Sequence, residues 1–189
     1  ASHPVVRATL DEAGAVLGQD LWALVDGGPS ESLNQTVNTQ PVMLAAGVAA
    51  WRAWLAAGGA QPVLLAGHSL GEYSALVLAG VLPLAAAVRL VRRRGELMQE
   101  AVPVGVGAMA AILGLESAAV RALAAEAAAE SATGEVCAVA NYNSPEQTVI
   151  AGDAAAVERA LPLLKDAGAK RVVPLPVSAP FHCALMEPV

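Results

Sequence analysis

Ser69 is the central residue of a GHSLG sequence that joins two different apolar patterns. Residues 62–66 are a short apolar run that predicts a strand, and residues 72–79 have the spacing of a helix. A serine on such a tight turn needs glycine two positions away on each side, because side chains there would collide with neighbouring backbone. Gly67 and Gly71 meet this need. The pattern predicts a nucleophile elbow and acyl chemistry, and a glycine-rich turn with a solvated serine is the alternative.

A serine nucleophile needs a base, and the chain contains three histidines. His3 is expected to be solvated near the terminus. His68 precedes the serine within the turn, where its ring should face away from the hydroxyl and pack. His182 follows the last predicted strand, where it can approach the elbow. On position alone, a core histidine without a catalytic role is an equal alternative for His182.

Arg94 falls on the apolar stripe of a predicted helix over residues 83–101. A guanidinium keeps its charge, so a buried one must find an anion, and its planar fork suits a carboxylate. We expect a protein carboxylate first and a substrate carboxylate second. Arg92 and Arg93 should instead form a solvated face near Glu96.

Composition limits the class of protein. The 189 residues are 56% hydrophobic and 15% charged, which is enough apolar material for a sizeable core. The longest apolar stretch is too short to span a bilayer, and no signal peptide is seen, so we expect a soluble, cytoplasmic protein. We also expect a monomer. A net charge of −6 disfavours nucleic acid. The two cysteines lack CxxC spacing, so neither a disulfide nor a metal site is expected.

The order of patterns predicts an α/β fold made of two parts. Residues 1–105 and 177–189 are expected to form part of a parallel-sheet core of the α/β-hydrolase type, which carries the elbow. Residues 106–176 change to the order βαββαβ, which is typical of a ferredoxin-like subdomain inserted into that core. Within the first part we expect helices at residues 4–17 and from about residue 41 to Gly58.

Five segments together resemble the malonyl-CoA:acyl carrier protein transacylases. They read GHSLGEYSAL at 67–76, RRRGELMQEAV at 92–102, GAMAAILGLE at 107–116, NYNSPEQTVIAG at 141–152 and VSAPFHCALM at 177–186. The resemblance covers essentially the whole chain, and the motifs occur in the family's order.

The resemblance implies roles for individual residues. Ser69 matches the acylated nucleophile, His182 the general base and Arg94 the ligand of the malonyl carboxylate, while Leu70 supplies an oxyanion N–H. The implied reaction moves malonyl from CoA to the phosphopantetheine thiol of acyl carrier protein in two steps, without metal or cofactor.

Further residues are implied less directly. Asn141 and Asn143 would line the substrate cleft, and Phe181 with Leu70 resembles a pattern that selects malonyl over an α-methyl branch. Because carrier proteins of this kind are acidic, docking should use a local basic patch. The candidates are the pair Lys170 and Arg171 and the pair Arg92 and Arg93.

Members of this family begin with a strand and a GQGSQ-like loop, and they continue beyond the histidine motif. Neither segment is found here, so we expect an internal fragment whose own activity the sequence leaves open. Three alternatives follow: an acyltransferase domain of a polyketide synthase, a serine esterase or thioesterase, and a non-catalytic carrier-binding piece. The esterase needs an acidic residue between Ser69 and His182, and Glu116, Glu135 and Asp153 are poorly placed.

Overall fold

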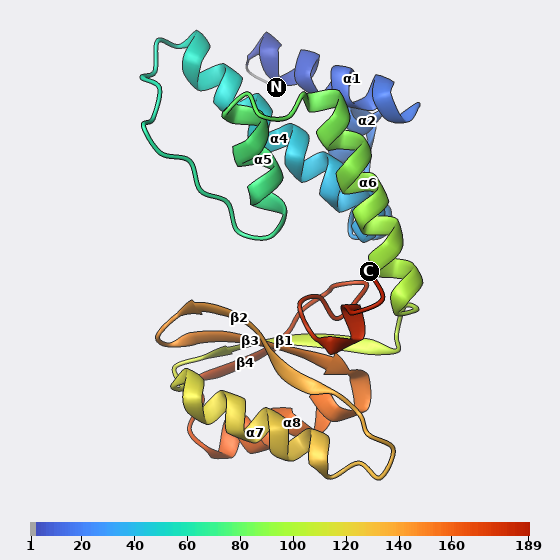
Figure 1. Cartoon of the computed structure of the whole chain (residues 1–189), viewed down its shortest axis with the longest axis vertical. Coiled ribbons are helices and arrows are strands. Elements are labelled where there is room, and N and C mark those ends of the chain that lie inside the picture. The colour runs from blue at the N-terminus through green and yellow to red at the C-terminus, as the bar shows by residue number, and fades with distance from the viewer. Residues whose placement is uncertain (1–2) are drawn as a thin grey trace. The chain divides into compact units, whose positions relative to one another are not determined.

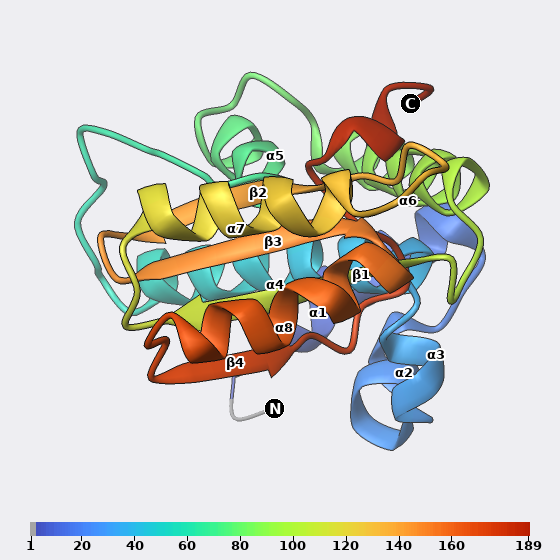
Figure 2. The ribbon, with the colours of Figure 1, turned by 90° about the horizontal axis from the view of Figure 1, so that it is seen from below.

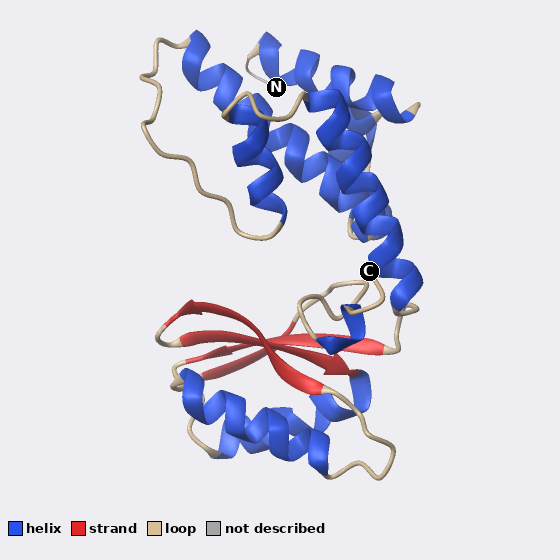
Figure 3. Cartoon of the chain, viewed as in Figure 1, coloured by secondary structure: helices blue, strands red, loops and turns tan. Residues whose placement is uncertain are grey.

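The computed structural model describes residues 3–189 (Figure 1). The chain divides into two compact units, Ala1–Glu96 and Leu97–Val189, and each is described by itself. Helices make up the regular structure of the first unit, whereas the second combines helices with a sheet (Figure 3). No helix among residues 3–189 is both long enough and apolar enough to cross a membrane.

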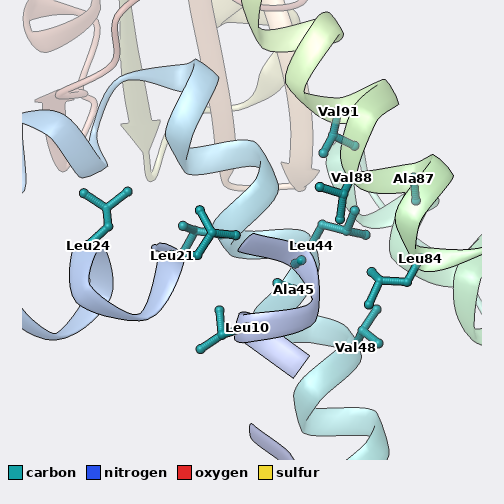
Figure 4. Close-up of a cluster of buried hydrophobic side chains, with 12 residues drawn as sticks. Leu10, Leu21, Leu24, Leu44, Ala45, Val48, Leu84, Ala87, Val88 and Val91 are labelled. Atoms are coloured by element: carbon teal, nitrogen blue, oxygen red, sulfur yellow. The ribbon is translucent and has the colours of Figure 1, made fainter. Parts of the chain in front are cut away.

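The first unit is built on helices whose apolar faces meet in one core (Figure 4). Leu10 from the first helix, Leu44 from the long fourth helix and Val88 from the sixth are at most 4% exposed. This burial supplies most of the stability that short helices lack in isolation. The helices are α1 (Pro4–Leu17), α2 (Leu21–Gly27), α3 (Ser30–Leu33), α4 (Thr36–Ala56), α5 (Leu70–Leu78) and α6 (Leu84–Ala101), whose last residues belong to the second unit.

The predicted strand at residues 62–66 is wrong for this structure. These residues belong to an irregular connection between α4 and α5, and Val63 and Leu64 are 96% and 85% exposed. A parallel strand requires hydrogen-bonding neighbours on a sheet buried on both faces. The described residues of the first unit contain no strand to pair with this run. In this structure the apolar run therefore has no sheet with which it can pair.

The long helix begins earlier than its proline indicated. A proline is well tolerated in the first turn, so the pattern placed the start near Pro41. In the structure α4 starts at Thr36, and Pro41 lies inside the helix and is fully buried. The added turn carries Thr36 and Gln40, two polar residues that are both 5% exposed. The predictions for α1 and α6 are confirmed to within one residue.

The second unit contains a four-stranded antiparallel sheet with two helices, and its βαββαβ order confirms the prediction (Figure 2). The sheet order is β2-β3-β1-β4, as in ferredoxin-like units. Whether residues 177–189 belong with 1–105, as predicted, stays a prediction. The elements are β1 (Gly107–Leu113), α7 (Ser117–Ala129), β2 (Cys137–Ser144), β3 (Gln147–Asp153), α8 (Ala154–Asp166), β4 (Arg171–Pro174) and a short 3₁₀ helix (Ala184–Met186).

The two faces of this sheet bury different partners. Ala110 and Ile112 of β1 point toward α7 and α8 and form a core with them. Met109 and Ala111 point the other way, where Phe181 packs against them. Side chains alternate along a strand, so consecutive residues of β1 serve both faces. The segment that carries His182 thus lies on the face opposite the helices (Figure 1).

Candidate active site

Ser69 occupies the predicted turn, directly before α5. Its backbone has φ 52° and ψ −110°, a strained conformation for a residue with a side chain. Leu70 is the first residue of α5, so its N–H has no acceptor within the helix. The next N–H, that of Gly71, donates to the His68 carbonyl at 2.9 Å. The turn therefore combines a strained serine with an N–H suited to an oxyanion.

The two flanking glycines differ in what they do. A Cβ atom on Gly67 would overlap the backbone of Gly71 and Glu72, whereas a Cβ on Gly71 would meet nothing within 4 Å in the described residues. The expectation that both positions exclude side chains is correct for Gly67 and wrong for Gly71. The turn is tight because the chain entering it at Gly67 touches the chain leaving it at Gly71.

Arg94 contacts Ser69 directly. Its Nη2 donates to Ser69 Oγ at 3.0 Å and its Nη1 donates to Gln40 Oε1 at 2.7 Å. Gln40 is 5% exposed, and its Nε2 in turn donates to Thr36 Oγ1 at 2.8 Å. Each end of the Gln40 amide is thereby satisfied, which fixes the position of the guanidinium.

The partners of Arg94 are uncharged, contrary to the expectation of a protein carboxylate. In the described structure it binds a serine and an amide, and its guanidinium carbon lies 6.0 Å from the centre of the Tyr73 ring. Burial lowers the pKa of Arg94, and the electrostatic interaction with Tyr73 raises that pKa by a smaller amount. A half-buried cation among neutral groups favours a carboxylate ligand, which supplies the missing countercharge.

A close approach of two helices brings Arg94 to Gln40. Gly95 is buried where α6 meets α4, and a Cβ there would lie 2.9 Å from Val37 Cα. A larger residue would push the helices apart by several tenths of an ångström or more. Because Gly95 adjoins Arg94, the same contact sets the reach of the guanidinium to Ser69.

The other predicted residues belong to the second unit. His182 is exposed and has a positive φ of 60°, and Phe181 beside it packs on the sheet. Asn141 is half-buried in β2 opposite Val149, and Asn143 is exposed where the β2–β3 register shifts. The structure thus places Ser69, Leu70 and Arg94 in the first unit, where Arg94 bonds to Ser69, and it places the other four candidates, His182, Phe181, Asn141 and Asn143, in the second unit.

Residues 1–189 match the acyl transferase domain family over their whole length. The chain belongs to this family. It is 58% identical to the malonyl CoA-acyl carrier protein transacylase of Salmonella typhimurium over 188 residues, which is all of this chain and 60% of the relative. It is 46% identical to the Bacillus subtilis protein of the same name, over 98% of this chain and 57% of that one.

Solved structures agree with this assignment. An acyl carrier protein S-malonyltransferase from Vibrio cholerae superposes with a TM-score of 0.87 at 60% identity, over 98% of this chain and 60% of that one. A malonyl-transacylase solved in complex with a type II PKS acyl-carrier protein gives a TM-score of 0.92 at 56% identity, over 99% and 59%. This acyl transferase chain spans 60% of the length of the curated relatives from Salmonella typhimurium and Escherichia coli.

Several side chains of the first unit differ from their predictions in exposure or in bonding partners. Arg92 is half-buried and donates to the side chains of Gln19 and Asn38, the latter at 3.2 Å, so it is not part of a solvated face. His68 is exposed where we expected packing, and His3 is half-buried and accepts the Val5 N–H at 3.3 Å as the cap of α1. Gln19 lies between α1 and α2 and Asn38 lies in α4, so residue spacing within α6 does not reveal these partners of Arg92.

Sequence reasoning missed two residues of the acyl transferase site. Gln40 shares a helix face with Thr36 and Leu44 at spacings of four, so burial of its amide could have been predicted. A buried amide needs polar partners, which is the signal that could have found its bond to Arg94. Tyr73 follows Ser69 by four residues, and its contact with Arg94 had no signal in the sequence.

Proposed function

We propose that the protein carrying this chain transfers malonyl groups from CoA to the phosphopantetheine thiol of an acyl carrier protein, through a malonyl ester on Ser69. The observation that carries the proposal is the 3.0 Å contact between Arg94 Nη2 and Ser69 Oγ. It puts a carboxylate-binding cation within reach of a strained nucleophile. A malonyl thioester offers both groups that this pair needs, a carbonyl and a free carboxylate.

In the first half-reaction, His182 removes the proton from Ser69 Oγ as the oxygen attacks the thioester carbonyl. The Leu70 N–H stabilises the oxyanion, and Arg94 holds the malonyl carboxylate. The carbon–sulfur bond then breaks, and His182 returns its proton to the CoA sulfur. The products are malonyl-Ser69 and free CoA.

In the second half-reaction, the carrier thiol loses its proton to His182 and attacks the Ser69 ester. Ser69 leaves as the alkoxide and regains a proton from His182, and the malonyl group is now bound to the carrier thiol. Asn141 and Asn143 contribute to the substrate site, and Phe181 with Leu70 disfavours α-branched acids. No metal or redox cofactor enters this scheme.

Two finer proposals concern the fold and the partner. The protein carrying this chain has a parallel-sheet core of the α/β-hydrolase type, which is supported by the exposed apolar side chains of Val63 and Leu64 before the elbow. The carrier protein docks on Lys170 and Arg171, since both are exposed and the ion pair of Lys170 is with the exposed Glu146 at 3.6 Å. The alternative pair is weakened because Arg92 is half-buried within the first unit.

The test is intact mass of the full natural chain after brief exposure to malonyl-CoA. We expect a malonyl adduct on the wild type and none on Ser69→Ala. Ser74→Ala is the matched control, because Ser74 is half-buried like Ser69 and lies within α5, outside the elbow. Malonylation that persists in Ser69→Ala would reject the proposed nucleophile.

The same experiment separates a serine esterase or thioesterase. An esterase passes the acyl group to water, so the adduct would decay without carrier protein and free malonate would accumulate. A transferase keeps its adduct until carrier protein is added. The placement of Arg94 against Ser69 favours the transferase, because simple ester hydrolysis has no use for a carboxylate ligand there.

A further inference from the structure

His182 has a left-handed backbone, with φ 60°. This conformation is unfavourable for a residue other than glycine and persists only where the surrounding structure enforces it. We propose that Gln99 and Gly107 are positioning residues for His182, because they fix the segment of residues 178–183 from two different elements. The inference rests on the proposed role of His182 as general base.

Gln99 ties this segment to the end of α6. Its Nε2 donates one hydrogen bond to the Val102 carbonyl and one to the Ser178 carbonyl, each at 3.1 Å. Both N–H groups of the amide are therefore used on backbone acceptors. The first bond holds the side chain near the helix terminus, and the second holds the chain four residues before His182. Because both acceptors are backbone atoms, Gln99 constrains the path of the chain.

Gly107 fixes the same segment from the start of β1. Pro180 is fully buried, and a Cβ atom on Gly107 would lie 2.5 Å from Pro180 Cδ and closer still to Cγ. Real Cβ atoms essentially never approach within 3.0 Å of another heavy atom. The absence of a side chain at Gly107 is thus what lets the proline ring lie against the strand.

Local contacts carry the constraint from Pro180 to His182. The Phe181 N–H donates to the Ala179 carbonyl at 3.1 Å, which closes a tight turn around the proline. The Cys183 thiol donates to the Pro180 carbonyl at 3.1 Å across His182. His182 therefore lies between Phe181 and Cys183, and these bonds hold both neighbours in place. A shift of Ser178 or Pro180 must then move the imidazole.

The test is a double-mutant cycle on the rate of malonyl-Ser69 formation, measured by intact mass over seconds to hours in the full natural chain. Gln99→Met keeps the approximate length of the side chain and removes both donors. A displacement of the base near 1 Å costs roughly 100-fold in rate, so we expect a loss of about 10- to 100-fold. The malonyl-CoA concentration for half-maximal rate should stay unchanged, because Arg94 is untouched.

In a His182→Ala background, Gln99→Met should change the residual rate less than about twofold, because the base that it positions is gone. Ser117→Ala is the control for general destabilisation of the second unit, since it removes the 2.8 Å hydroxyl pair with Thr148 away from this segment. It should leave the rate within about twofold of wild type. Gly107→Ala reaches the same segment independently and serves if Gln99→Met does not fold.

The outcomes are distinct. A wild-type rate in Gln99→Met and Gly107→Ala, or an equal loss with and without His182, would overturn the positioning role. A wild-type rate in His182→Ala alone would instead reject His182 as the base and with it that part of the proposed function. A large loss that disappears in the His182→Ala background supports both.

Discussion

Replacing Gly67 with alanine tests whether the elbow depends on close contact between its two arms, the chain that enters the turn at Gly67 and the chain that leaves it at Gly71. The added Cβ would overlap the carbonyl group of Gly71 and the N–H of Glu72. Both are backbone atoms in the first turn of α5, so no side-chain rotation can make room. To bring the Cβ to the 3.0 Å limit of real contacts, the arms must separate by about 1 Å. That movement displaces Ser69 from Arg94, which now lies 3.0 Å away.

The magnitude follows from this displacement. Overpacking of this kind costs about 1–3 kcal/mol in the free energy of unfolding. A nucleophile misplaced by about 1 Å loses about 100-fold in rate, equivalent to about 2.7 kcal/mol. We expect these losses in Gly67→Ala, measured by thermal unfolding and by the rate of malonyl-Ser69 formation. Gly71→Ala should lose no more than about threefold in rate and should be no less stable, because alanine favours a helix by about 1 kcal/mol over glycine.

The contrast between the two glycines is what can fail. Wild-type stability and acylation in Gly67→Ala would show that the arms are not in contact. An equally damaged Gly71→Ala would show that the side-chain space at both positions matters, as the sequence pattern alone implies. Either result would refute the steric reasoning.

Three more predictions concern charged and buried groups. Arg94→Met should slow malonylation of the enzyme by about 10- to 100-fold relative to acetylation, since a charge-assisted bond contributes about 1.5–3 kcal/mol; competition between the two CoA esters, read by mass, measures this. Arg92→Met should lower the free energy of unfolding by about 1–3 kcal/mol, because its guanidinium binds two side-chain amides. Arg93→Met, which breaks an exposed pair, should cost less than about 1 kcal/mol in the same denaturant titration. Burial, with a smaller contribution from Cys183, raises the pKa of Cys137 to about 11, so iodoacetamide at pH 9 should label Cys137 only after unfolding; the folded state favours the protonated thiol, so this contribution to stability is lost as the pH rises toward 11.

Local sequence rules determined much of this protein. The periodicity of apolar residues placed α1 and α6 to within one residue, and the order of patterns predicted the βαββαβ elements of the second unit. The GHSLG sequence located a strained serine before a helix, which the φ of 52° at Ser69 confirms. Each of these features depends on a few neighbouring residues, so a short window of sequence contains the information. Family membership was also readable, because five separate motifs occur in one order.

Only the tertiary structure decided which groups meet. Arg94 was placed on an apolar stripe, yet its bonds to Gln40 and Ser69 join residues 54 and 25 positions apart. The run at 62–66 has the composition of a strand, but pairing requires neighbours that the described chain does not provide. The two glycines of the elbow look equivalent in the sequence, and only the path of the backbone shows that Gly67 alone excludes a side chain. In each case the outcome depends on contacts between distant segments, which short-range propensity does not encode.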